Sequence, residues 1–416
     1  MPRTADALRR EVLDADTILL EYALGDRRSW LWAVTPAEIA SFELPARGEI
    51  ERVAREAYER VTARQARVDE PAAQAARRVQ AADAEWRRLG ARLGHMLLGP
   101  AAAHLGDAWR GKRLLIVAPD ILQYVPFAAL PDPAAPGQPL VVDHEWISLP
   151  SASLLALIRE QAPARPPHAG RLAVLADPVF EADDPRITAV DRRGSRPAPD
   201  EPAFTPTARA LRGLKAMGDT QPPRLTRLPF SRQEARAISS LVPAGARLVA
   251  TDFDASRAIV VGGALDGYDI VHFATHGLLN SERPELSGLV LSLVDRHGDV
   301  QDGFLRLGDV YNLELRADVV VLSACQTALG REVRGEGLIG LTRGFMHAGA
   351  RRVVASLWQV DDSATAELMR SFYRGVLHDG LRPAAALRAA QRELARDPRW
   401  AAPFFWSGFV LQGDWR

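Results

Sequence analysis

The residue types that could carry out covalent chemistry lie in two short segments, each directly after an apolar run. The first is His272–Gly277 (HFATHG) and the second is Ser323–Gly330 (SACQTALG). A cysteine thiol with a free pKa of about 8.5 is only a few per cent thiolate at neutral pH, so it needs a nearby base. An imidazole can take that proton and later protonate a leaving amine. We therefore consider Cys325 a nucleophile and His276 its base.

Cys325 is the only cysteine among the 416 residues, which rules out an intramolecular disulfide. A lone thiol is either a buried apolar filler or a reactive group, and composition alone favours the filler. The paired histidine favours the reactive group. Cys325 lies 49 positions (325 − 276) after His276, which is enough for a strand, loops and a crossover between two parallel strands.

An acyl intermediate would need two hydrogen-bond donors for its developing negative charge. Gly277 directly follows the base, and the absence of a Cβ lets its backbone N–H approach a substrate. The amide of Cys325 is the natural second donor, so we expect these two amides to form the oxyanion site. For His272, four residues before His276, a core or buried polar role is favoured over contact with the site.

Apolar runs with the length of buried strands recur after Gly111. Strands this apolar are typical of a mostly parallel sheet that helices cover on both faces. Open α/β sheets hold their sites at the carboxyl ends of strands, so the two segments are expected at one edge of this sheet. Helical patterns begin near Ser231 and near Gly337, and a third runs from Ser363 through Tyr373 and leads to an Ala-rich stretch over residues 383–396. The strand-like runs are Leu114–Val117, Trp146–Leu149, Leu172–Leu175, Tyr268–Phe273, Val319–Leu322 and Arg352–Trp358.

The N-terminal part has a different pattern. Residues 17–45 hold three strand-length runs, and residues 47–98 carry apolar positions with helical spacing. We expect an N-terminal tail (1–16), a β unit plus helical segment (17–110) and one large domain (111–416). Within that domain residues 181–224 are rich in Pro and Arg, which indicates a long exposed insertion. Its many Arg–X bonds leave two alternatives, an activation or self-cleavage loop and plain surface disorder.

Bulk composition narrows the functional classes. Lys plus Arg number 52 and Asp plus Glu number 52, and this balance gives no reason to expect a nucleic-acid or anionic-membrane partner. Neither a signal-peptide pattern nor an apolar run near the ~20 residues of a membrane helix is present, so we expect a cytoplasmic protein. One cysteine cannot form a Cys–His zinc motif, and no Walker-type phosphate loop occurs, so no cofactor or metal is expected.

These segments, with others in the same order, resemble the CHAT family, a caspase-like group of the caspase–separase cysteine peptidases often found downstream of tetratricopeptide repeats in bacteria. The resemblance covers roughly residues 112–413. It implies an α/β caspase-like fold, a mostly parallel central sheet flanked by helices, with the preceding β unit and helical segment. The segments beyond the two described above are Leu115–Asp120, Tyr124–Leu130, Leu149–Leu154, Leu286–Ser292, Gly335–Leu341, Ser356–Asp362 and Phe405–Leu411.

The resemblance also implies a function. Such domains serve in regulated peptide cleavage, often in bacterial defence or programmed death. We therefore expect a protein substrate and an activating or sensor protein of helical-repeat type, which could be a separate chain.

Substrate specificity is where this chain departs from the caspase pattern, in which the histidine precedes Gln-Ala-Cys-(Arg/Gln/Gly)-Gly by about 50 residues. Ser323 replaces the Gln and Thr327 the Gly, so the resemblance does not by itself imply the caspase preference for Asp, and specificity for a basic or an acidic residue stays open. The separase-like branch reads a basic residue with an acidic one, and Asp361 is the candidate for that role because a carboxylate can bind Arg bidentately. Asp361 could equally cap the helix expected near Ser363.

Ser356 and Trp358 complete the expected substrate-binding set, although Trp358 could instead be a packed aromatic. Two functional classes remain open. One is a cysteine endopeptidase that cleaves after a basic residue under the control of a partner or ligand. The other is a catalytically silent interaction scaffold with the same fold. The presence of both His276 and Cys325 favours the enzyme, because a scaffold needs neither; another thiol acyl transfer would use the same pair.

Overall fold

The computed structural model describes residues 4–67, 70–161, 170–187, 225–279, 286–323, 325–328 and 336–416, with the backbone alone at Ala5, Gln161 and Leu279 and over 325–328 and 336–339. These residues form two compact units, one comprising Met1–Arg165 with Ser371–Arg416 and the other Pro166–Arg370. The division expected from the sequence at residue 111 stays a prediction, and most of the expected 181–224 insertion lies outside the described residues.

The first unit is built on a sheet with the strand order β3-β2-β1-β4-β5-β15. The three strands expected within residues 17–45 are confirmed as an antiparallel meander, and β1 then pairs in parallel with β4. The parallel order continues through β5 to β15. The strands are β1 (Thr17–Ala23), β2 (Ser29–Val34), β3 (Ile39–Leu44), β4 (Arg113–Val117), β5 (Glu145–Ser148) and β15 (Phe409–Gly413).

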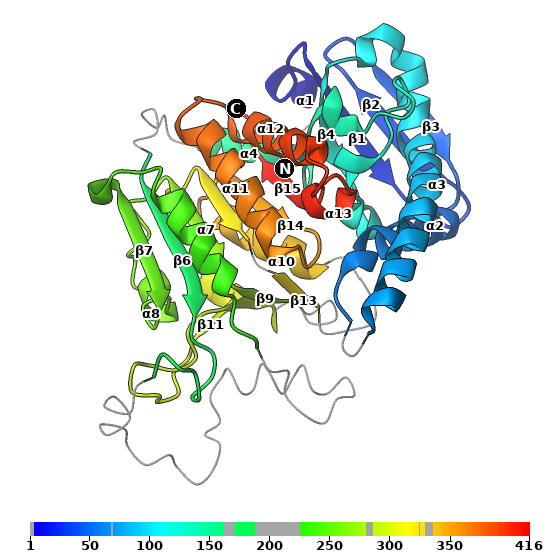
Figure 1. Cartoon of the computed structure of the whole chain (residues 1–416). Coiled ribbons are helices and arrows are strands. Elements are labelled where there is room, and N and C mark those ends of the chain that lie inside the picture. The colour runs from blue at the N-terminus through cyan, green and yellow to red at the C-terminus, as the bar shows by residue number, and fades with distance from the viewer. Residues whose placement is uncertain are drawn as a thin grey trace. The chain divides into compact units, whose positions relative to one another are not determined.

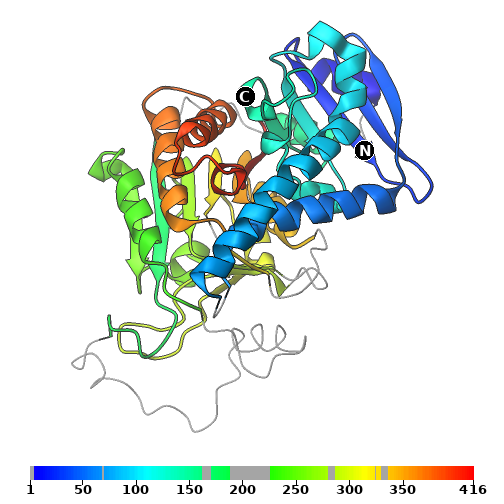
Figure 2. The same ribbon diagram turned by 45° about the vertical axis from the view of Figure 1, so that its right-hand side comes forward.

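Two long helices follow the meander, as the helical spacing of residues 47–98 predicts. They are α2 (Arg47–Val61) and α3 (Ala72–Leu105), which pack against each other and are coloured blue to cyan in Figure 2. The buried residues of α2 recur at three- and four-residue steps, so a single apolar stripe faces the unit's interior. The unit's other helices are α1 (Ala5–Glu11), α4 (Ala152–Gln161), α12 (Pro383–Arg396) and α13 (Pro403–Trp406).

The second unit carries a parallel sheet of the order β14-β12-β8-β6-β7. Four of these strands coincide with apolar runs in the sequence, and most of their residues are buried on both faces. The sequence did not predict the edge strand β7, whose side chains are mostly half-buried. The strands are β6 (Leu172–Pro178), β7 (Arg247–Asp252), β8 (Ile270–Ala274), β12 (Val319–Leu322) and β14 (Arg352–Ser356).

A smaller sheet, which the sequence did not predict, extends this unit. Within the described residues it has four strands in the order β11-β10-β9-β13, each of them three or four residues long. Segments this short carry too few residues for a recognisable alternation. The strands are β9 (His276–Leu279), β10 (Gly288–Val290), β11 (Phe304–Arg306) and β13 (Cys325–Ala328).

Helices pack against the parallel sheet of the second unit, as α7 does over β6 in Figure 1. The expected helices near Ser231, Gly337 and Ser363 are confirmed as α7 (Pro229–Ser239), α10 (Glu336–His347) and α11 (Asp362–Leu377). Shorter helices of this unit are α8 (Arg257–Val261) and α9 (Leu307–Tyr311), and the 3-10 turn η6 (Ala244–Ala246) also belongs to it. The 3-10 turns described in the first unit are η1 (Thr62–Arg64), η2 (Gly106–Trp109), η3 (Asp120–Tyr124), η4 (Phe127–Ala129) and η5 (Leu140–Val142). The expected α/β fold, a mostly parallel sheet flanked by helices, is confirmed.

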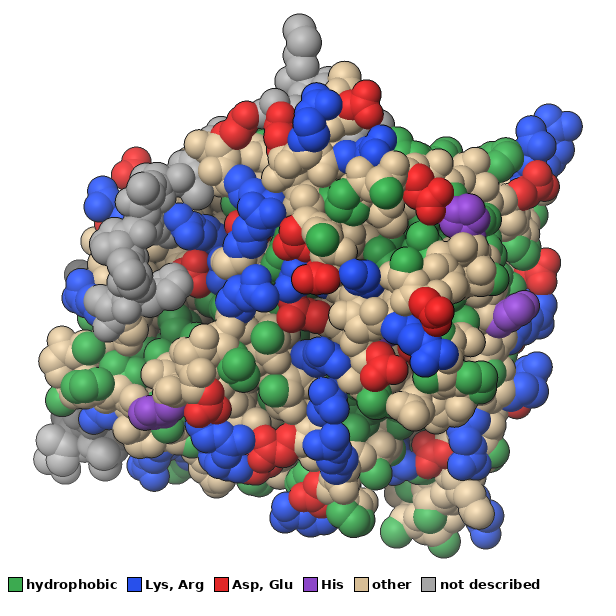
Figure 3. Space-filling view, turned by 90° about the horizontal axis from the view of Figure 1, so that it is seen from above, with side chains coloured by type: hydrophobic (Ala, Val, Ile, Leu, Met, Phe, Trp, Pro, Cys, Tyr) green, Lys and Arg blue, Asp and Glu red, His purple; other side chains and the backbone are tan. Residues whose placement is uncertain are grey.

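Two observations, one on surface charge and one on the helices, bear on the expected partners. On the face seen in Figure 3, basic and acidic side chains are interspersed, as the equal numbers of the two kinds in the sequence would suggest. Among the described helices, none combines the length and the apolar character needed to cross a bilayer.

Candidate active site

The segments that contain His276 and Cys325 leave the parallel sheet of the second unit at the same edge. Strands β8 and β12 are parallel neighbours, and Phe273 is the register partner of Leu322 near their carboxyl ends. The chain then enters β9 at His276 and β13 at Cys325. Because the first pair of strands is parallel and ends together, the residues that follow arrive side by side, as the sequence predicted.

His276 and Cys325 are themselves Cα partners in the parallel pairing of β9 with β13. Neighbouring strands lie about 4.8 Å apart, so the two backbones are as close as a sheet permits. The structure thus brings together the two residues that the sequence selected as base and nucleophile. Their catalytic roles stay predictions, and the Cys325 side chain is not among the described features.

The imidazole of His276 is enclosed by the second unit. The residue is 5% exposed, and the ring lies 5.0 Å, centroid to centroid, from the ring of Phe180, which follows β6. Burial disfavours the charged imidazolium and lowers the pKa of His276 below its usual 6.5, while the carbonyl of Thr226 opposes this shift in part. The imidazole of His276 is therefore neutral at neutral pH.

The tautomer of that neutral ring follows from a single contact. Nε2 of His276 lies 2.7 Å from the carbonyl oxygen of Thr226, and a carbonyl can only accept a hydrogen bond. Nε2 therefore carries the ring proton, and Nδ1 holds the lone pair. Nδ1 is buried and has no hydrogen-bond partner within the described part of the chain, which omits the Cys325 side chain. A ring in this state can accept a proton at Nδ1.

Gly277 lies inside the smaller sheet. Its register partners are Leu289 of β10 on one side and Gln326 of β13 on the other. The amide of Gly277 thus belongs to a paired strand, and Cys325 likewise begins one. Their joint role as oxyanion donors stays a prediction.

His272 has the buried polar role that the sequence favoured. It is fully buried in the middle of β8, and its Nε2 lies 3.2 Å from Oε1 of Glu234 on α7. The last two residues of β8 and Thr275 separate His272 from the start of β9.

The expected substrate-binding residues occupy the end of β14 and the loop after it. Ser356 ends the strand and is buried, and Trp358 is 0% exposed, which matches the packed-aromatic alternative. Oδ1 of Asp361 accepts hydrogen bonds from the Ser363 amide at 3.1 Å, the Ser363 hydroxyl at 2.6 Å and the Ala364 amide at 2.9 Å. Asp361 is thus the N-terminal cap of α11. A role of the three residues in substrate binding stays a prediction.

Sequence reasoning missed the residues that hold the imidazole. Thr226 acts through its backbone carbonyl, so no side-chain type at that position could have pointed to it. Phe180 belongs to an apolar cluster with residues of β9, β10 and β11, and one aromatic after a strand is no signal by itself. The contact of the Thr226 carbonyl with His276 links positions 50 residues apart, a separation at which no local sequence pattern pairs two residues.

The CHAT domain family matches this chain over residues 87–414. Two curated relatives, both called Tetratricopeptide repeat protein 28, match a shorter stretch. The mouse (Mus musculus) protein is 37% identical over 110 residues, 26% of this chain and 4% of its own length. The human (Homo sapiens) protein is 36% identical over 115 residues, 28% of this chain and 5% of its own length. This chain thus spans a small fraction of the curated relatives it matches.

Among solved structures, a chain of the separase–securin complex of Saccharomyces cerevisiae is similar in fold. The TM-score is 0.53 at 8% sequence identity, and the match covers 98% of this chain and 31% of the yeast chain. At that identity the likeness concerns the fold alone, which is caspase-like.

Proposed function

This chain belongs to the CHAT domain family, and on that basis we propose that it is a caspase-like cysteine endopeptidase with Cys325 as nucleophile and His276 as base. One observation carries the proposal: the two residues are register partners at the start of paired strands. The Nδ1 lone pair of a neutral, buried imidazole supplies the second requirement, a base that is ready to accept a thiol proton.

The proposed reaction proceeds in two steps. Nδ1 of His276 takes the thiol proton of Cys325 while the sulfur attacks the scissile carbonyl carbon, and amide donors, proposed at Gly277 and Cys325, stabilise the oxyanion. The C–N bond then breaks, and the imidazolium gives its proton to the leaving amine. A water molecule, deprotonated by the same imidazole, hydrolyses the thioester and returns the free thiol. The bond from Nε2–H to Thr226 stabilises the imidazolium formed on the way.

We propose a preference for cleavage after a basic residue, with Asp361 as the acidic reader and Ser356 and Trp358 beside it. Oδ1 of Asp361 is committed to the cap of α11, so a substrate guanidinium would have to bind through the other oxygen.

Control by a protein partner is the third part. The relatives are named for tetratricopeptide repeats, and the yeast chain of similar fold was crystallised in a complex of two proteins. We propose that a helical-repeat protein or protein segment activates this peptidase in the cytoplasm, in a defence response that cleaves a protein substrate.

A panel of fluorogenic peptides ending in Arg, Lys or Asp tests the activity, with a peptide chloromethylketone as a covalent probe. We expect cleavage after Arg or Lys and a single label on Cys325. Cleavage that survives in Cys325→Ala would exclude the thiol mechanism. Absence of both cleavage and label with the activator present would favour the alternative, a catalytically silent CHAT scaffold.

A further inference from the structure

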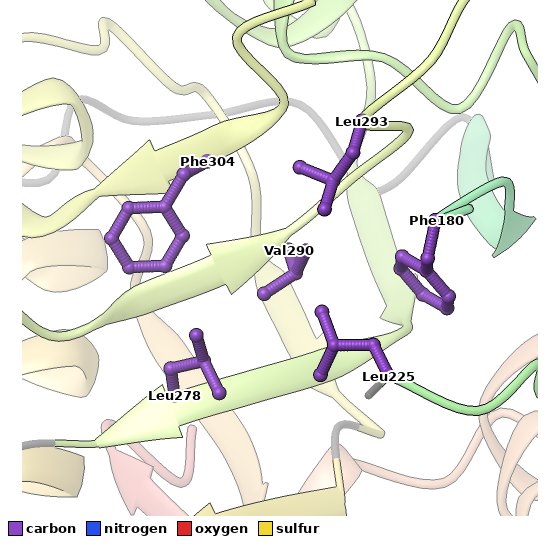
Figure 4. Packing of buried hydrophobic residues seen from close by; sticks show 6 residues of the cluster. All are labelled: Phe180, Leu225, Leu278, Val290, Leu293 and Phe304. Carbon is purple, nitrogen blue, oxygen red and sulfur yellow. The ribbon is translucent and has the colours of Figure 1, made fainter. Parts of the chain in front are cut away.

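The carbonyl of Thr226 fixes the tautomer of His276, yet Thr226 does not lie in a helix or strand. It belongs to residues 225–228, an irregular stretch directly before α7. Its position therefore depends on the side chains beside it. Leu225 is buried in a cluster defined by Phe180, Leu278, Val290, Leu293 and Phe304, which Figure 4 shows gathered around β9 and β10.

On the other side of Thr226, Arg227 forms a bidentate ion pair with Asp177. Nε of Arg227 lies 3.0 Å from Oδ1, and Nη2 lies 2.8 Å from Oδ2. Two parallel N–H···O bonds fix the plane of the guanidinium as well as its distance. Arg227 itself is partly exposed, whereas the Asp177 side chain is 0% exposed. This Arg227–Asp177 ion pair, called the clamp below, therefore joins the irregular segment 225–228 at the surface to the buried carboxylate of Asp177.

Asp177 is held from several directions. Its carboxylate also contacts Nε of Arg232 at 2.7 Å and Nη1 of Arg186 at 3.3 Å, and its amide donates to the Ser231 hydroxyl at 2.9 Å. Arg186 and Arg232 both continue to Asp252, which closes the network on β7. A carboxylate with this many charged donors has little freedom to move, so it can act as a rigid anchor for Arg227.

The backbone at Asp177 is unusual too. Its φ is +47°, in the left-handed region that a non-glycine residue rarely adopts, and the register of β6 with β7 is irregular from Ala176 to Pro178. Three residues later the same segment supplies Phe180, whose ring lies against His276. One bend at the end of β6 thus presents both the anchor for Arg227 and a wall for the imidazole.

We propose that Asp177 and Arg227 are positioning residues for the base: their ion pair holds the Thr226 carbonyl against Nε2 of His276. This inference rests on the proposed function. Without the clamp, the Thr226 carbonyl loses its fixed position and Nε2–H loses its acceptor. The imidazole then also populates the tautomer protonated at Nδ1, which cannot accept the thiol proton.

Alkylation of the single cysteine tests this without knowledge of the natural substrate. Because Cys325 is the only thiol, the rate of iodoacetamide modification as a function of pH reports on that residue alone. We expect the intact protein to react well below the free-thiol pKa of about 8.5. In Arg227→Ala the rate at pH 7 should fall roughly 5- to 20-fold, and the profile should move toward that of a free thiol.

Conservative variants separate positioning from folding. Arg227→Lys keeps the charge without the planar fork, and Asp177→Asn keeps the shape without the charge, so each should give a profile between the parent and Arg227→Ala. Arg296→Ala is the matched control, because Arg296 is an exposed arginine of the same unit that pairs with Asp254, not Asp177. It should keep the parent profile. Imidazole ¹⁵N shifts should show Nδ1 unprotonated in the parent and partly protonated in Arg227→Ala.

The outcomes distinguish the two proposals. If His276→Ala shifts the profile and Arg227→Ala does not, the clamp is overturned while the Cys–His pair stands. If His276→Ala itself leaves the parent profile unchanged, the pair does not exist, and both proposals fall. A lowered melting temperature in Arg227→Ala, with parent profile and parent ¹⁵N shifts, would mean that the ion pair is purely structural.

Discussion

Cys325 and His276 begin two strands that pair in parallel, and they are each other's register partners. The pairing continues a relationship set up one step earlier, where β8 and β12 run side by side in the parallel sheet. The alignment of the two residues therefore follows from two fully buried strands of the second unit. A change that disturbs the register of the smaller sheet should disturb the chemistry even where no site residue is altered.

The acid limb of the pH–rate profile should lie below pH 6.5. Burial lowers the pKa of His276, and the neutral imidazole is the active form, so the active form persists to lower pH than an exposed histidine would allow. The rate of peptide cleavage, or of Cys325 alkylation, measured from pH 4.5 to 8 checks this. A midpoint at or above the ordinary histidine value of about 6.5 would contradict the buried environment described for the ring.

Phe180→Ala should move that acid limb upward as well as weaken the fold. Phe180 is 6% exposed, and its removal lets water reach the imidazole, which favours the protonated form. Loss of a buried Phe side chain costs about 3–5 kcal/mol of unfolding free energy. Phe180→Leu, which retains much of the apolar volume, is the comparison. It should lose less stability and shift the limb less. Equal acid limbs in all three proteins would show that Phe180 does not shield the base.

Asp361→Ala should lower the unfolding free energy by about 0.5–2 kcal/mol, the usual value of a helix cap, and Asp361→Asn should recover most of it. The loss follows from the three hydrogen bonds that Oδ1 accepts at the start of α11. Denaturant unfolding at pH 7 measures it. In the same variants, kcat/KM for Arg and Asp substrates tests the proposed specificity. If Asp361→Ala keeps an Arg preference, Asp361 is a cap only.

Asp362→Asn is the control for the two Asp361 variants, and here we expect no loss of unfolding free energy. Burial raises the pKa of Asp362, and repulsion from Asp361 and Glu234 adds to the shift. A raised pKa in the folded state means that the ionised carboxylate is destabilising at neutral pH, so removal of its charge should leave stability unchanged or increase it. Stability falling as far as in Asp361→Ala would show that Asp362 makes a contribution comparable to the cap.

The sequence predicted the strands that are uniformly apolar and the helices whose apolar residues are regularly spaced. Apolar runs such as Val319–Leu322 identify buried parallel strands, and their carboxyl ends located His276 and Cys325. The smaller sheet was not predicted because most of its short strands, such as His276–Leu279 and Cys325–Ala328, mix polar or glycine residues with apolar ones and form no continuous apolar run. The contact of the Thr226 carbonyl with His276 could not be predicted, because every residue has a backbone carbonyl and the residue type does not indicate which one is used. At Asp361 the sequence offered two interpretations that one carboxylate satisfies equally well, and only the geometry showed the cap.

Gly288→Ala should damage the site from a distance, through the smaller sheet. Gly288 lies in β10, between β11 and the strand that begins with His276. A Cβ at this position would meet the Leu305 carbonyl oxygen at 2.3 Å and Cζ of Phe304 at 3.0 Å. Neither strand can move away without losing its pairing, so we expect a loss of about 1–3 kcal/mol, typical of overpacking, together with a marked fall in Cys325 reactivity.

Gly308→Ala provides the matched control for this prediction. Gly308 lies in α9 of the same unit, and an added Cβ would have nothing within 4 Å. Alanine is the better helix former by roughly 1 kcal/mol, so this variant should be as stable as the parent or slightly more so, with unchanged reactivity. Denaturant unfolding and the rate of alkylation at pH 7 give both readouts. Should Gly288→Ala retain parent stability and parent reactivity, the close packing of β10 against β11 would not govern the site, and the alignment of His276 with Cys325 would have to depend on β8 and β12 alone.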